Sequence, residues 1–243
     1  MKIYAKTDTG LVRATNQDAY FAGELESGGL FAVVCDGMGG ANGGNVASQT
    51  AVKLISEYVI QSYTPRMDSL GVERMLKRAI ENSNLEVFEM AKTSKELEGM
   101  GTTAVVVFVK DGTAVIAHVG DSRAYLVNNE LTQITKDHSV VQNLLENGQI
   151  TLEDAKNHPN KNVITRALGA EENVMVDISE LPLEENDSLL LCTDGLSGLI
   201  DGEEIFKVLK ETEASAAPQE LVDLANKAGG TDNITVVILT TDC

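Results

Sequence analysis

The pattern of apolar and polar positions predicts a chain built mainly of strands, with helices gathered in two places. Apolar or alternating runs of strand length are joined mostly by short turns, which favours antiparallel pairing. Apolar residues at helical spacing predict two long helices early in the chain and two shorter helices late. The strands are expected at 2–9, 19–22, 31–35, 102–109, 114–119, 124–127, 131–135, 174–178, 188–193 and 234–240, and the main helices at about 46–59, 69–92, 202–211 and 218–228.

This order of elements decides the fold class. Strands and helices do not alternate regularly, which argues against a doubly wound parallel sheet. We therefore predict an α+β fold, a four-layer α-β-β-α sandwich of two antiparallel sheets flanked by helices. The chain shows no linker and no low-complexity segment, so residues 1–243 form a single domain in this interpretation. The polar, broken pattern of about 137–170 predicts a small flap inserted between sheet elements.

Composition narrows the function classes. The chain has 243 residues, of which 43% are hydrophobic, enough for one large core. A formal net charge of −18 argues against a basic surface of the kind that binds nucleic acid or an anionic membrane. No apolar run approaches the roughly 20 residues of a membrane span, and the first residues do not read as a signal peptide. We therefore expect neither nucleic acid nor membrane as a partner.

The cysteines and histidines indicate a compartment and a ligand type. Cys35, Cys192 and Cys243 have no close spacing, which is typical of a reducing compartment, so a cytoplasmic protein is expected. The three histidines and three cysteines form no cluster spaced for zinc. A metal in this protein would therefore be held by oxygen atoms.

Two stretches repeat one design, an apolar strand that ends at an aspartate followed by glycine. Asp36 and Gly37 follow the apolar run 31–35, and Asp194 and Gly195 follow the run 188–192 and one threonine. A carboxylate at the end of a dry strand must be paired, bound to a metal or used in chemistry. Two aspartates brought to one point repel each other unless a cation lies between them.

Five aspartates in all stand where predicted strands begin or end: Asp18, Asp36, Asp121, Asp194 and Asp232. Taken singly, each is most often a turn former or a surface charge, as in the turn at Asp111-Gly112. As a group, they offer the oxygen ligands that Mg²⁺ and Mn²⁺ prefer. Two such ions about 3.5–4 Å apart can activate water for attack on phosphorus. Arg13 has a planar guanidinium group that can donate paired hydrogen bonds to phosphate oxygens.

Six sequence blocks occur in an order that resembles the metal-dependent Ser/Thr protein phosphatases of type 2C, the PPM family, in their compact bacterial form. The resemblance spans nearly the whole chain. The blocks are Arg13 with Asn16-Gln17-Asp18, Asp36-Gly37-Met38-Gly39-Gly40, Gly101-Thr102-Thr103, Gly120-Asp121-Ser122-Arg123, Thr193-Asp194-Gly195 and Asp232-Asn233-Ile234-Thr235.

The resemblance implies a site for two core Mn²⁺ or Mg²⁺ ions in a channel at one edge of the sandwich, with a weaker third ion. It implies that a hydroxide bridging the metals attacks phosphoserine or phosphothreonine without a phosphoenzyme. The implied roles are Asp36 bridging both ions, the Gly37 carbonyl on one ion, Asp194 and Asp232 on the other, Asp18 through a water, Asp121 with Asp194 on the third ion, Arg13 on phosphate and Asn233 orienting the cluster.

Met38 is a departure from the family pattern. Many eukaryotic members have at this position a histidine that is proposed to protonate the leaving group, and methionine cannot donate a proton. Metal-bound water or another group must then do so. We expect His118 to be a sheet histidine, with the general acid as its alternative, and His138 and His158 to lie on the flap surface. Arg166 is expected in a flap ion pair, with substrate contact as the alternative.

The resulting hypothesis is a monomeric, metal-dependent protein phosphatase that acts in signalling on phosphorylated proteins and opposes a Ser/Thr kinase. One rival is a pseudophosphatase that keeps the fold as a binding module. The presence of all the acidic residues and of Arg13 argues against this rival. The other rival is a phosphatase dedicated to one regulatory partner.

Overall fold

In the computed structural model, which describes residues 1–240, two antiparallel sheets pack face to face. One sheet has the strand order β1-β11-β10-β7-β8 and the other has the order β2-β3-β5-β6-β9, with the short β4 paired to β3. The strands are β1 (Lys2–Asp8), β2 (Asp18–Glu24), β3 (Leu30–Met38), β4 (Gly101–Thr102), β5 (Ala104–Lys110), β6 (Thr113–Val119), β7 (Arg123–Val127), β8 (Leu131–Gln133), β9 (Asp177–Pro182), β10 (Ser188–Cys192) and β11 (Ile234–Thr240).

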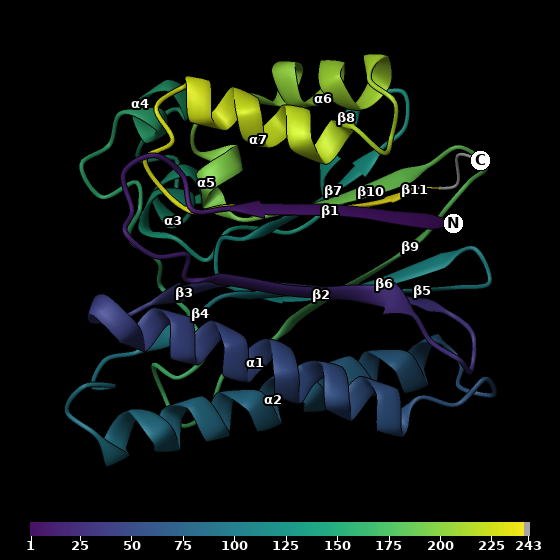
Figure 1. Cartoon of the computed structure of the whole chain (residues 1–243), viewed down its shortest axis with the longest axis horizontal. Coiled ribbons are helices and arrows are strands. Elements are labelled where there is room, and N and C mark those ends of the chain that lie inside the picture. The colour runs from purple at the N-terminus through teal and green to yellow at the C-terminus, as the bar shows by residue number, and fades with distance from the viewer. Residues whose placement is uncertain (241–243) are drawn as a thin grey trace.

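Helices cover the outer face of each sheet, which gives the four layers visible in Figure 1. The long helices α1 and α2 lie on the sheet that contains β3, and α6 and α7 lie on the sheet that contains β11. The described helices are α1 (Gly40–Ser62), α2 (Ser69–Thr93), α3 (Val140–Glu146), α4 (Leu152–Lys156), α5 (Asp194–Ser197), α6 (Gly202–Glu211) and α7 (Ala217–Lys227). The predicted α+β sandwich is confirmed.

Three apolar clusters correspond to the three interfaces between these layers. Val33 and Cys35 face α1 and α2, whereas Val34, from the same strand, faces the other sheet. This alternation follows from the two-residue period of side chains on a strand. A strand covered on both faces needs apolar residues at every position, which is why 31–35 is an unbroken apolar run. The run therefore places Asp36 at the edge of the dry interior.

The structure differs from the predicted elements in a few places. The predicted strand at 102–109 is divided at Thr103, and the strand expected at 174–178 runs instead from Asp177 to Pro182. Val174 and Val176 pack against the core without joining the sheet. The short helix α5, which begins at Asp194, was not predicted.

The structure also bears on the state of the cysteines and on whether any helix could cross a membrane. Cys35 and Cys192 are buried free thiols, and Cys243 lies outside the described residues. Within residues 1–240, no helix has both the length and the apolar character that crossing a membrane requires.

Candidate metal centre

Asp18 and Asp36 face each other on neighbouring strands at the edge of one sheet. The antiparallel register of β2 and β3 pairs these two residues directly. The backbone of Asp36 is fixed by Thr103, whose N–H donates to Asp36 O and whose Oγ1 accepts from Asp36 N, both at 2.9 Å. Thr102 Oγ1 also donates to Asp36 O at 2.8 Å. The break between β4 and β5 at Thr103 therefore holds the aspartate in place.

Asp194 and Asp232 come from the other sheet. Asp194 begins α5 after the end of β10, and Asp232 lies two residues before β11, the strand beside β10. Hydrogen bonds join the two sheets at this point, because Thr193 Oγ1 and Thr235 Oγ1 donate to Asp18 Oδ2 at 2.9 and 2.7 Å. The carboxylates therefore meet at the seam between the sheets.

Gly37 lies where the backbone is too crowded for any side chain. Its N–H donates to Gln17 O at 3.1 Å. A Cβ at position 37 would collide with the carbonyl oxygens of Gly44 and Gln17. Glycine at this position lets β3, the Gln17 loop and the start of α1 approach one another beside Asp36.

Burial and neighbouring carboxylates raise the pKa of Asp18, Asp36 and Asp194. Burial raises the pKa of Asp18 to about 7, although the hydrogen bonds from the two threonines act in the opposite direction. Burial, followed by the charges of Asp18, Asp194, Asp121 and Asp232, holds the pKa of Asp36 well above its usual value. Burial and the charge of Asp232 also raise the pKa of Asp194. Asp36 is thus close enough to the other four predicted aspartates for their charges to act on it.

Asp121 lies at the corner between β6 and β7. Burial, with the charges of Asp194 and Asp137, raises its pKa to about 7. The next residue, Ser122, makes a 2.7 Å hydroxyl–hydroxyl bond to Thr103, the residue that fixes Asp36. The corner is thereby tied to the same anchor as the main cluster.

Arg13 reaches the cluster from the loop between β1 and β2. Its Nη2 donates to Asp232 Oδ2 at 2.7 Å, and 53% of its side chain is exposed. Asn233 holds this loop: its Oδ1 accepts from Gln17 N at 2.8 Å, and its Nδ2 donates to Thr9 O and Thr15 O. Asn233 therefore positions the loop that carries Arg13, while the neighbouring Asp232 pairs with the guanidinium.

The donor set fits a divalent cation. Among the described residues, Asp18 Oδ1 and Asp194 Oδ1 are buried carboxylate oxygens without a hydrogen-bond partner. A buried carboxylate with an unsatisfied oxygen is unfavourable unless a cation or another donor compensates it. Clustered oxygen ligands of this kind are those that Mg²⁺ and Mn²⁺ prefer.

Sequence reasoning missed the residues that support the carboxylates. Thr103, Thr193 and Thr235 all lie inside the blocks that carried the family resemblance, but their partners are visible only in the fold. The expected surface position of His138 is wrong, because its side chain is buried. His118 is a buried sheet histidine and Arg166 forms an ion pair with Asp177, both as expected.

Comparisons with known proteins show the family of the chain. Residues 12–227 match the family model described as Protein phosphatase 2C. The chain is 40% identical over 239 residues to the serine/threonine phosphatase stp of Listeria monocytogenes, covering 98% of this chain and 94% of that protein.

Solved structures give the same result. The serine/threonine phosphatase Stp1 from Staphylococcus aureus matches with a TM-score of 0.94 and 34% identity, covering 100% of this chain and 95% of that one. The catalytic domain of the phosphatase PstP in complex with two manganese ions matches with a TM-score of 0.86 and 34% identity, covering 99% and 98%.

Proposed function

Because the chain belongs to the protein phosphatase 2C family and is a metal-dependent serine/threonine phosphoprotein phosphatase, we propose that the carboxylate cluster at the seam is its metal centre. The observation that carries this assignment is the pair of buried, unpartnered oxygens on Asp18 and Asp194 amid mutually repelling carboxylates. In this proposal Asp36, Asp194, Asp232 and the Gly37 carbonyl hold two Mn²⁺ or Mg²⁺ ions, Asp18 acts through water, and Asp121 with Asp194 holds a weaker third ion.

The bound ions supply water of lowered pKa and positive charge that offsets the charge on the phosphate. The protein residues supply the placement. Thr102 and Thr103 fix the backbone of Asp36, and Thr193 and Thr235 orient Asp18 from the opposite sheet. Cys35 takes no part as a nucleophile, because burial raises its pKa and keeps the thiol protonated.

Calorimetric titration with Mn²⁺ tests the metal assignment. Two tight sites and one weaker site are expected from the number of carboxylates that serve each ion, since fewer charged ligands bind more weakly. A single tight site would contradict the dinuclear centre.

Arg13 is proposed to bind the phosphate of the substrate. Its half-exposed guanidinium is held next to the cluster by Asp232, and its remaining N–H groups can donate to phosphate oxygens. A planar fork matches the geometry of a phosphate better than a lysine ammonium does.

Replacing Arg13 by alanine is expected to raise KM for a phosphothreonine peptide and to lower kcat/KM about 10–100-fold, because charge-assisted hydrogen bonds are worth about 1.5–3 kcal/mol. Metal affinity should change by less than about fivefold, since the exposed pair with Asp232 is worth about 0–1 kcal/mol. Arg13→Lys is the matched control and should recover part of the loss. Unchanged steady-state kinetics in Arg13→Ala would mean that Arg13 is a surface residue without a role in binding phosphate.

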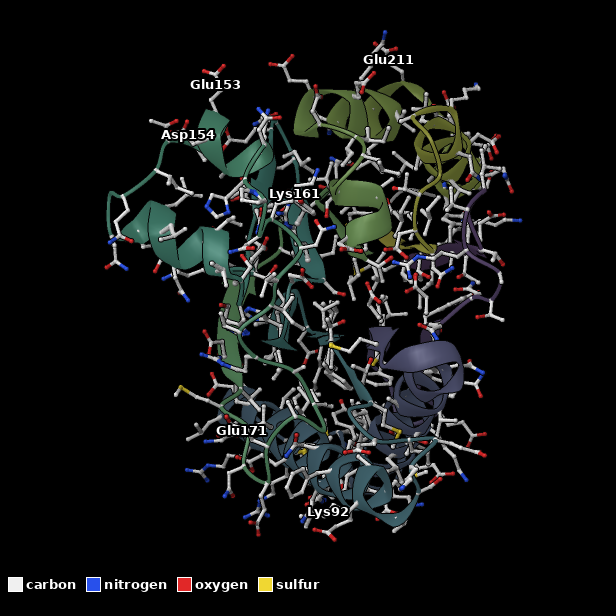
Figure 2. The ribbon with its side chains drawn as sticks, turned by 90° about the vertical axis from the view of Figure 1, so that its left-hand side faces the viewer. Lys92, Glu153, Asp154, Lys161, Glu171 and Glu211 are labelled. Atoms are coloured by element: carbon white, nitrogen blue, oxygen red, sulfur yellow. The ribbon has the colours of Figure 1, made fainter. Side chains whose placement is uncertain are left out.

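The segment 137–170 is proposed to act as a flap that helps to select protein substrates. Neither α3 nor α4 contains a buried residue, and Glu153 on α4 points away from the body in Figure 2. A cleft of about 530 Å³ separates the two helices from the body, with Leu145 and Leu152 on one side and Ile200 on the other. A weakly packed element beside the site suits a role in recognition.

The substrates of this family are phosphorylated proteins, and we propose that this enzyme opposes a Ser/Thr kinase, because hydrolysis of phosphoserine and phosphothreonine reverses that reaction. A cytoplasmic location is proposed from the two buried free thiols. A monomer is proposed because the metal centre draws all its predicted ligands from one chain.

A further inference from the structure

A second group of potential ligand residues lies beside the Asp121 corner. His118 on β6, His138 at the entry to the flap and Asp177 at the start of β9 each offer one ligand atom, and these atoms lie within 4.8 Å of one another. The two imidazole rings stack with their centroids 4.7 Å apart and their planes 10° apart. Both histidine side chains are buried, so the group is part of the folded interior.

The hydrogen bonds of His138 argue against a metal at this group. Its Nδ1 accepts the N–H of Gly120 at 3.0 Å, so this nitrogen is not free to bind a metal. Burial lowers the pKa of His138 to about 4, which keeps the ring neutral. Nε2 lies 2.9 Å from Arg166 Nη1 and 3.3 Å from Asp177 Oδ2, and Arg166 Nη1 also donates to Asp177 Oδ1 at 2.7 Å. The Arg166 guanidinium thus already contacts both the second ring nitrogen and the carboxylate that a metal would need.

His138 instead holds Gly120 through two bonds. Besides the bond to its ring, the backbone N–H of His138 donates to Gly120 O at 3.0 Å. Gly120 has a φ of 106°, and a Cβ there would meet the side chain of Thr103 at 2.5 Å. The glycine is therefore packed between Thr103 and His138, with its backbone N–H and C=O both bound to His138.

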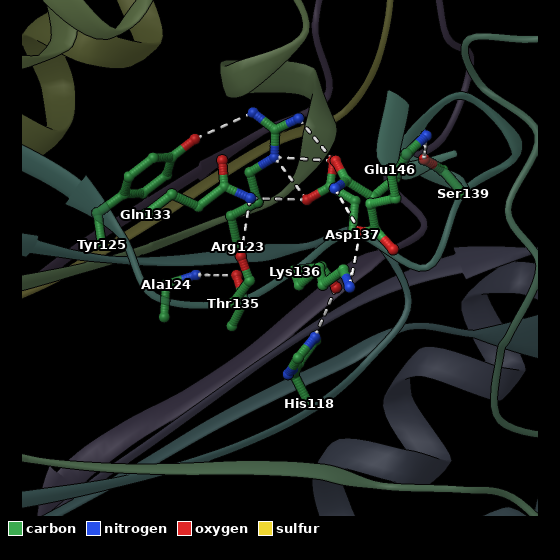
Figure 3. A network of polar contacts seen from close by, with 11 residues as sticks. His118, Arg123, Ala124, Tyr125, Gln133, Thr135, Lys136, Asp137, Ser139 and Glu146 are labelled. Atoms are coloured by element: carbon green, nitrogen blue, oxygen red, sulfur yellow. Dashed lines mark hydrogen bonds and ion pairs between the residues drawn. The ribbon is translucent and has the colours of Figure 1, made fainter. Parts of the chain in front are cut away.

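The residues before His138 are anchored as well. Arg123 donates from Nε and Nη2 to the carboxylate of Asp137 at distances of 2.6–3.1 Å, as Figure 3 shows. His118 Nε2 lies 2.9 Å from Lys136 O in the same view. The imidazole of His138 thus projects from a fixed stretch of backbone.

Asp121 lies between two such anchors. Gly120 on one side is held by His138, and Ser122 on the other side is bonded to Thr103. We propose that His138 is a positioning residue that orients Asp121 toward the third metal ion through its bond to the Gly120 N–H. The backbone O of His138 also accepts from Thr165 N at 2.7 Å, so the same residue joins the two ends of the flap to the metal corner.

This inference rests on the proposed role of Asp121 as a ligand of the third ion. Partners outside the ligand set fix ligand orientation, and their replacement typically lowers metal affinity by about 10–100-fold. Loss of the His138–Gly120 bond should therefore weaken the third site. The two tight sites should remain, because Asp36 and Asp18 have their own anchors in Thr102, Thr103, Thr193 and Thr235.

Two substitutions separate the two nitrogens of the ring. In His138→Asn the amide oxygen can take the place of Nδ1 and accept from Gly120, whereas in His138→Gln the amide reaches the place of Nε2 and the Gly120 bond is lost. Calorimetric Mn²⁺ titration should show the weaker site about tenfold weaker in the glutamine variant and within about threefold of the parent in the asparagine variant. Hydrogen exchange at the Gly120 amide should be faster only in the glutamine variant.

An unchanged weaker site in His138→Gln would overturn the inference, and so would equal losses in both variants. The variant Asp121→Ala separates the positioning role of His138 from the proposed function. If Asp121→Ala keeps the weaker metal site, the assignment of Asp121 as a ligand fails. If Asp121→Ala loses that site while His138→Gln keeps it, only the positioning role of His138 fails. If the glutamine variant does not fold, the asparagine variant carries the test, because a lost third site in it would contradict the role of Nδ1.

Discussion

Chelation of divalent metal is expected to abolish hydrolysis of a phosphothreonine peptide, and Mn²⁺ or Mg²⁺ is expected to restore it. Besides the ions, the proposed site contains five carboxylates and one arginine. When the ions are removed, no group remains to activate water or to offset the negative charge of the carboxylates and the phosphate. Release of phosphate from the peptide, measured in excess EDTA and after addition of excess metal, is the test. Full turnover in the chelator would contradict the metal mechanism.

The chelated protein should also show a characteristic dependence of stability on pH. The pKa values of Asp18 and Asp121 rise from 3.8 to about 7 in the folded chain, so folding favours their protonated forms. Their contribution to stability is therefore fully present below about pH 4 and is lost as pH rises through about 7. Bound metal requires the ionised carboxylates, so the gain in stability from metal should grow over the same range.

Scanning calorimetry at pH 5 and pH 8, with and without Mn²⁺, measures this difference. The melting temperatures of the chelated and metal-loaded protein should lie closer together at pH 5 than at pH 8. A separation that does not depend on pH would mean that the carboxylates at the seam are not the metal ligands.

Asp36→Ala should eliminate both tight metal sites and reduce kcat/KM by about 10³-fold or more, because the proposed centre loses the carboxylate that serves both ions and with it several kcal/mol of charge stabilisation. Asp121→Ala should keep the two tight sites and lose most of its turnover. The difference follows from position, since Asp36 lies among four other carboxylates, whereas Asp121 lies at a corner.

Metal stoichiometry by calorimetry and peptide kinetics on both variants test this difference. Asp111→Asn is the matched control, because Asp111 also precedes a glycine but lies exposed in the turn between β5 and β6. Its metal binding and kinetics should equal those of the parent. Parental turnover of Asp121→Ala at every metal concentration would remove the third ion from the mechanism.

The core strands and the acidic residues could be predicted from the sequence because their signals are local. An unbroken apolar run marks a strand buried on both faces, and an aspartate at its end is unusual without a partner. Convergence of the five aspartates was a hypothesis from their places at strand ends, to which the resemblance added the individual roles, since β2, β3, β10 and β11 are distant in the chain. The structure brings these residues together, and their role as ligands stays a prediction.

The supporting contacts could not be predicted from local patterns. His138 stands in the polar run Lys136-Asp137-His138-Ser139, which is typical of a surface, yet the fold buries it against Gly120. The strand expected at 174–178 failed for a related reason. Val174 and Val176 have strand-like character but pack on the core, while the edge strand β9, which has only Ile178 and Leu181 as large apolar residues, pairs with β6.

The position of β11 between β1 and β10 has a consequence for biosynthesis. β11 follows every other strand in the chain, but its neighbours in the sheet are the first strand and β10. During translation, β1 has no partner and Asp232 has no fixed position until this strand emerges. Closing so large a loop is entropically unfavourable until the whole strand can pair. The nascent polypeptide therefore gains a complete acidic site only after synthesis has passed Thr240.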